Sequence, residues 1–79
     1  MLTVELKDPD GVTDGRVEVE IVCDEDGFDQ LKRQLNFLEG PANHVHLATP
    51  AWAGTELDEE AQGEGNLIVH QLTIHKLNK

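Results

Sequence analysis

The chain has 79 residues, which is enough for one domain over residues 1–79 and too few for a second. Its formal net charge of -10 comes from 16 acidic residues against 6 basic ones. This balance argues against binding to nucleic acid, where lysine and arginine must replace counterions, and against binding to an anionic membrane surface. The acidity either only maintains solubility or also steers the protein electrostatically toward a basic partner.

The cysteine content and the first residues indicate a compartment. Cys23 is the single cysteine, so no internal disulfide can form, and a reducing compartment is compatible with this. Because Cys23 continues the alternation of the apolar residues before it, we expect an inert thiol on the buried face of a strand. The start Met1–Glu5 lacks the basic flank and long apolar run of a secretory signal, and no segment approaches the roughly 20 apolar residues of a membrane span. We therefore expect a cytoplasmic protein.

Two segments with alternating apolar side chains open the chain and predict an antiparallel β-hairpin. In residues 2–7, one set faces the core and the other faces solvent. The inward set is Leu2, Val4 and Leu6, and the outward set is Thr3, Glu5 and Lys7. The turn signal Asp8–Gly11 comes next, and residues 12–15 extend the loop. Residues 16–22 alternate again, with Val17, Val19 and Ile21 inward.

The middle of the chain predicts an amphipathic helix that ends at Gly40 and Pro41. Asp26 is the predicted N-cap, and the acidic residues around it fall where the helix dipole favours them. Apolar residues recur at spacings of three and four and form one stripe, which we expect to pack on the strands. The stripe consists of Phe28, Leu31, Leu35 and Leu38.

Two further strands complete the predicted fold. Residues 43–48 predict a third strand, with Val45 and Leu47 inward and His44 and His46 outward. A long, acidic connection runs from Thr49 to about Gly65. Residues 66–76 predict a fourth strand, and its better apolar face is Ile68, Leu72 and Ile74. The expected fold is α+β with the order ββαββ, a four-stranded, mainly antiparallel sheet with one helix packed on one face.

The histidines are the first candidates for a metal-binding or catalytic site. His44 and His46 share a strand face, and two imidazoles at this spacing can present ligands to a metal. If the better apolar face of the fourth strand is buried, His75 joins them on the open face and His70 does not. A small metal-binding domain built on His44, His46 and His75, with or without catalytic activity, is therefore the alternative interpretation. The ligand set lacks a cysteine or a placed carboxylate, so we expect exposed strand histidines, no metal and no cofactor.

Nucleophilic catalysis has little support in the sequence. The chain contains no serine and no tyrosine. Thr49, Thr55 and Cys23 lack a motif with a base and an orienting carboxylate. Contiguous acids such as Asp58 and Glu59 in a polar loop are usually solvated. We therefore expect a non-enzymatic function.

Trp52 is the only tryptophan and lies in the long connection. It can fold over the edge of the core, or it can serve as an interface anchor, a role in which tryptophan is enriched. The acidic residues that follow would form a rim suited to a basic protein surface. The predicted partner-binding set is Trp52, Glu56, Asp58, Glu59 and Glu60.

The segment from His44 to Leu57 reads HVHLATPAWAGTEL and resembles the signature of a bacterial polymorphic-toxin immunity family, the thirty-second in the usual series. The likeness extends over residues 28–74 and includes Asn66 and His70. The chain departs from the pattern at Ala53, where a second glycine is often found. The resemblance implies a small cytoplasmic antidote that binds and neutralises a cognate toxin domain, with no enzymatic activity and no established cofactor. The sequence is also compatible with a homodimer.

Overall fold

The computed structural model describes residues 1–10 and 15–77, so Gly11 of the expected turn and the loop residues 12–14 lie outside the described residues. The fold is α+β, with one α-helix and antiparallel strands in the described ranges. The strands are β1 (Leu2–Lys7), β2 (Glu18–Cys23), β3 (His44–Ala48), β4 (Leu67–Ile68) and β5 (Gln71–His75). The helix α1 (Glu25–Asn36) is followed by the 3-10 turn η2 (Phe37–Glu39), and a second such turn, η3 (Pro50–Trp52), follows β3.

The strands form two sheets rather than the single four-stranded sheet that the periodicity predicts. One sheet has the order β2-β1-β4, and the other pairs β3 with β5. The predicted fourth strand is divided between them, because the chain passes from one sheet to the other after Val69. The Val69 amide still donates to the Val4 carbonyl of the first sheet, whereas the His70 carbonyl accepts the Thr49 amide beside the second.

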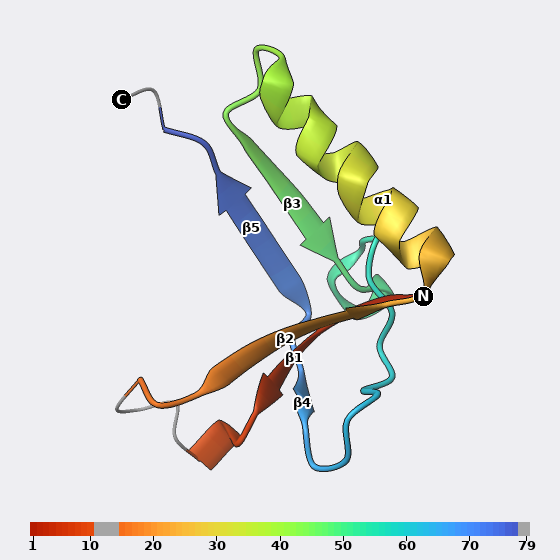
Figure 1. Ribbon diagram of the computed structural model, residues 1–79, viewed down its shortest axis with the longest axis vertical. Helices are drawn as coiled ribbons and strands as arrows, with labels where there is room; N and C mark the ends of the chain where they lie inside the picture. Colours follow the sequence, from red (N-terminus) through yellow and green to blue (C-terminus); the bar gives the residue numbers. More distant parts are fainter. Residues whose placement is uncertain (11–14, 78–79) are drawn as a thin grey trace.

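The core lies where the two sheets and the helix meet. Its buried apolar side chains are Leu2, Val4, Val45, Leu47 and Leu57. Half-buried side chains pack against this cluster, namely Leu31, Leu38, Val69, Leu72 and Ile74. In the β3-β5 sheet, Val45 is opposite Ile74 and Leu47 is opposite Leu72, which confirms that these residues share the inner face. The helix runs alongside β3 (Figure 1).

Several residues predicted to lie in the core are exposed. They are Val19, Ile21, Cys23, Phe28 and Leu35. The predictions of a buried Cys23 thiol and of a fully buried helical stripe are therefore wrong, and only Leu31 and Leu38 of the stripe pack on the core. For Val19 and Ile21 the reason is visible in Figure 1: α1 and the β3-β5 sheet lie over one end of the β2-β1-β4 sheet, and the rest of that sheet projects away from them.

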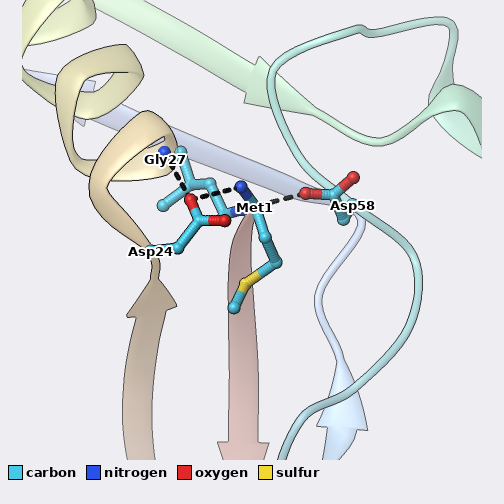
Figure 2. A network of polar contacts seen from close by, with 5 residues as sticks. Met1, Asp24, Gly27 and Asp58 are labelled. Carbon is cyan, nitrogen blue, oxygen red and sulfur yellow. Dashed lines mark hydrogen bonds and ion pairs between the residues drawn. The ribbon is translucent and has the colours of Figure 1, made fainter.

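The N-cap of the helix lies two residues before the predicted one. Asp24 is the N-cap, and its carboxylate accepts the Gly27 amide at 2.8 Å, so Asp26 lies inside the first turn. The same oxygen accepts the Met1 amino group at 2.6 Å (Figure 2). The hydrogen bond from Met1, followed by that from Gly27, holds the pKa of Asp24 below its usual range. Gly27 allows this close approach, since a Cβ there would lie 1.7 Å from the Met1 carbonyl oxygen.

Candidate functional site

The long connection, residues 49–66, begins with a tight turn that is built on Thr49. Thr49 is buried, and its carbonyl accepts the amides of Trp52 and Gly54, each at 2.9 Å. Its hydroxyl lies 2.7 Å from Nδ1 of His70, which fixes the start of the turn to the crossing between β4 and β5. Gly54 is required by close packing, because a Cβ there would lie 2.3 Å from the Ala48 carbonyl oxygen.

This turn holds Trp52 out toward solvent. Trp52 is the last residue of η3 and is 61% exposed, so the interpretation in which it covers the core is wrong. The following residue, Ala53, has a φ of 63°, in the left-handed region that favours glycine. An exposed aromatic side chain therefore stands on a backbone that hydrogen bonds hold in place.

Three of the four acidic residues in the predicted partner-binding set brace the connection from within. Glu56 accepts the Ala48 amide at 3.0 Å, and this bond is the main cause that keeps its pKa below the usual range. The Asp58 carboxylate (Figure 2) accepts the Leu2 amide at 2.8 Å. The Asp58 amide donates to the Leu2 carbonyl at 2.8 Å.

The other two acids differ in their contacts. Glu59 accepts the Ala51 amide at 2.5 Å, inside η3 and next to Trp52. The side chain of Glu60 has no hydrogen bond or ion pair with any residue of the described ranges. Asp58, Glu59 and Glu60 are all exposed. The carboxylates of Glu56, Asp58 and Glu59 are therefore held by backbone amides, whereas within the described residues that of Glu60 is not.

The residue that organises the far end of the connection is Glu5, which the alternation of β1 predicts to face solvent. Its residue exposure is 0%, and so is that of Thr3. Its carboxylate accepts hydrogen bonds from the Thr3 hydroxyl at 2.5 Å, the Gln62 and Gly63 amides at 3.0 Å each, and the Asn66 side-chain amide at 2.9 Å. These donors outweigh burial and lower the pKa of Glu5 from 4.5 to about 2.

Sequence reasoning missed Glu5 because three of its four donors, Gln62, Gly63 and Asn66, lie 57 to 61 positions away in a segment without periodicity. No local pattern marks a strand glutamate as an anchor for a distant loop. The sequence contained only an indirect signal for this anchor. A buried carboxylate needs several hydrogen-bond donors, and the connection contains glycine and asparagine residues close together that can supply them. Asn66 also donates to Glu20 at 3.1 Å and so links the connection to β2 as well.

The histidines lie as the strand pattern predicts. His44 is directly opposite His75, and His46 is opposite Thr73, so all three imidazoles occupy the outer face of the β3-β5 sheet. The ring centroid of His44 lies 5.0 Å from that of His46 and 5.6 Å from that of His75.

Two ring nitrogens of this cluster have hydrogen-bond partners among the described residues, and one of them is Nδ1 of His44, which lies 2.7 Å from the Asn43 side-chain oxygen. His46 Nδ1 lies 2.8 Å from the Thr73 hydroxyl and 3.1 Å from the Gln71 side-chain nitrogen. Since that amide nitrogen can only donate, we assign Nδ1 of His46 as an acceptor. Within residues 1–10 and 15–77, no group of three or more His, Cys, Asp or Glu side chains is arranged to hold a metal ion.

The surface of the described residues has no pocket. The helix of this part of the chain falls short of the length and apolar character needed to cross a lipid bilayer. Comparisons of the chain with protein-family models, with curated proteins and with solved structures found no match.

Proposed function

We propose that this chain is an immunity-type protein, which binds a cognate bacterial toxin domain through the Trp52 turn and its acidic rim and thereby neutralises it. The observation that carries the proposal is the exposure of Trp52 on a turn whose backbone is already hydrogen-bonded. A preorganised aromatic side chain loses little conformational freedom on binding, and this favours affinity. The resemblance of residues 44–57 to the immunity-family signature supplies the choice of partner.

The acidic rim supports a partner with a basic surface. Asp58, Glu59 and Glu60 are exposed and follow one another along the connection, and the net charge of the chain is -10. Charges held at fixed positions steer a basic partner and fix its orientation more than they add affinity. Trp52 is therefore expected to limit dissociation, and the rim to set the rate of association.

The first test concerns the gene next to the one that encodes this chain. We expect the neighbouring gene to encode a toxin with a basic C-terminal domain. Expression of that toxin should stop bacterial growth, and coexpression of this chain should restore it. Calorimetry then compares the affinities of variants for the isolated toxin domain. Trp52→Ala should weaken binding by about 2 kcal/mol, or roughly thirtyfold in Kd. Glu60→Lys should slow association at low salt and have less effect at high salt.

Matched variants separate the interface from general damage to the fold. Phe37→Ala removes an equally exposed aromatic side chain that lies outside the connection, and it should leave the affinity unchanged. Circular dichroism must show that every variant is folded. A neighbouring gene without a toxin domain contradicts the immunity function. If folded Trp52→Ala and Glu60→Lys bind the toxin domain with the affinity of the parent chain, the Trp52 turn and its acidic rim are not the binding surface.

A further inference from the structure

The β2-β1-β4 sheet carries an apolar surface that nothing in the described chain covers. Leu6 is directly opposite Val19 of β2 and Leu67 of β4, so the three side chains form one row on the same face. Ile21 lies one step along β2 on that face, opposite Val4. Val19, Ile21 and Leu67 are 57%, 48% and 53% exposed, and Leu6 is half-buried. We call these four residues the β2 shelf. It lies on the part of the sheet that projects away from α1 (Figure 1).

The shelf borders an open edge of the sheet. In the order β2-β1-β4, the strand β2 has a neighbour on one side only among the described residues. Its pairing with β1 runs without a bulge through six consecutive positions, from Leu2↔Cys23 to Lys7↔Glu18. Sheet edges are often blunted by bulges, proline or charged side chains, and an edge beside an apolar face that lacks a bulge and proline can be a template for another strand. β2 has neither a bulge nor a proline, and its charged residues are Glu18 and Glu20.

The dimensions of the molecule agree with an incompletely covered surface. Its accessible area is 5554 Å². A folded monomer of this mass is expected to expose about 4,800 Å². The radius of gyration is 13.3 Å, whereas a compact domain of this length has about 11.6 Å. The chain therefore exposes more surface than a closed domain of its size.

The negative charge on β2 determines which kind of strand can pair with this edge. Glu18 and Glu20 alternate with the shelf residues and lie on the opposite face of the strand. If a second copy added its own β2 antiparallel and kept both shelves on one face, the glutamates of the two copies would share the other face and repel. Each chain would also bring a net charge of -10. A strand with lysine or arginine at alternate positions avoids both costs.

We infer that the open edge of β2 binds an extended segment of another protein, in which apolar residues alternate with lysine or arginine. The segment adds to the sheet beside β2 through backbone hydrogen bonds, as in other cases of strand addition. Its apolar side chains lie on the β2 shelf, and its basic side chains lie on the face of Glu18 and Glu20. This inference goes beyond the proposed function, because it involves neither Trp52 nor the acidic rim.

The test uses a synthetic nine-residue peptide of alternating lysine and valine, titrated into the ¹⁵N-labelled chain. We expect amide shifts and slowed hydrogen exchange within Glu18–Cys23. Val19→Thr/Ile21→Thr keeps side chains suited to a strand but removes the apolar surface, and it should weaken binding about tenfold or more, which corresponds to about 1.4 kcal/mol. Leu77→Thr is the matched control, because it replaces an exposed apolar residue beyond β5.

Two further peptides test the parts of the inference separately. A peptide of alternating glutamate and valine should not bind, since its charge repels Glu18 and Glu20. A lysine–valine peptide with alternate backbone nitrogens methylated keeps the side chains but cannot complete the strand ladder, and it should not bind either.

Four outcomes would overturn the inference. They are the absence of shifts in β2, shifts centred on Trp52, equal binding of either control peptide, and a dimer in solution whose β2 amides are already protected. None of these results depends on the identity of a toxin, so they leave the proposed function to its own test.

Discussion

Replacing Glu5 by glutamine tests how the long connection is held. The substitution keeps the size and shape of the side chain but exchanges one carboxylate oxygen for an NH₂ group. The parent carboxylate accepts hydrogen bonds at both oxygens, from the Gln62 amide at Oε2 and from the Gly63 amide at Oε1. Whichever way the glutamine amide is oriented, its NH₂ group faces at least one of these donors. We therefore expect Glu5→Gln to leave a buried N–H without an acceptor.

The expected loss can be worked out in two ways that agree. A buried donor left without a partner costs about 1–3 kcal/mol. The lowering of the Glu5 pKa from 4.5 to about 2 corresponds to about 3 kcal/mol of unfolding free energy at neutral pH. Glu5→Gln should thus lower the free energy of unfolding by about 2–3 kcal/mol at pH 7. A domain of this size has only about 3–5 kcal/mol in total, so this variant is near the limit of folding.

The pH dependence gives the sharper test. The folded-state pKa of Glu5 is depressed, so its stabilisation is complete above the unfolded pKa of 4.5 and is lost as the pH falls toward 2. The difference between the parent and Glu5→Gln should therefore be constant from about pH 7 to about pH 5 and then shrink as the pH falls further. Urea unfolding followed by far-UV circular dichroism measures it, in trimethylamine N-oxide if the variant is marginal.

The reasoning has a matched control and a clear point of failure. Glu60→Gln removes the charge of an exposed glutamate whose side chain braces nothing in the described residues, and it should change stability by less than about 0.5 kcal/mol. If Glu5→Gln costs no more than Glu60→Gln at pH 7, the carboxylate does not anchor the connection. If its cost is the same at about pH 3 as at pH 7, the cause is packing and not the ionised carboxylate.

Three further predictions follow from the packing and the turn. Ala53→Gly should raise the free energy of unfolding by about 0.5–1 kcal/mol, because glycine adopts the positive φ of this residue without steric cost. Leu31→Ala should cost about 2 kcal/mol or more, since Leu31 packs on the core. Leu35→Ala should cost about 1 kcal/mol or less, since Leu35 is 40% exposed. Protein purified without a histidine tag should contain no stoichiometric zinc by elemental analysis, because the histidine cluster lacks further ligands.

Each of these results can fail in a specific way. A loss of stability in Ala53→Gly would mean that the alanine methyl group makes contacts worth more than the steric cost of the left-handed conformation. Equal costs for Leu31→Ala and Leu35→Ala would mean that the two faces of α1 are buried alike. Stoichiometric zinc that is lost in His46→Ala would establish a metal site on the outer face of the β3-β5 sheet.

The acidic composition has a structural role beside its electrostatic one. Asp24 caps the helix, while Glu56, Asp58 and Glu59 accept backbone amides in or near the connection, and Glu5 anchors its far end. A loop without regular secondary structure leaves many backbone N–H groups without partners, and carboxylates are strong acceptors for them. From composition alone, these acids resemble a solvated rim, and only the fold separates the bracing acids from Glu60.

The sequence by itself determined the features that depend on neighbouring residues. Alternation along residues 2–7 and 43–48 placed β1 and β3, and it put His44 and His46 on the face opposite Val45 and Leu47. Helical spacing placed α1, although Asp24 and not Asp26 begins it. These predictions succeeded because strand and helix periodicity follow from backbone geometry within a few residues.

The tertiary structure decided what depends on distant contacts. It buried Glu5 under residues 62–66, divided the fourth strand between two sheets, and left Val19 and Leu67 exposed. Periodicity shows which side chains share a face, but it does not show which faces another element covers. Which faces are covered depends on where the helix and the long connection pack, because each can cover only part of the sheet. It also depends on whether the buried polar groups find hydrogen-bond partners there.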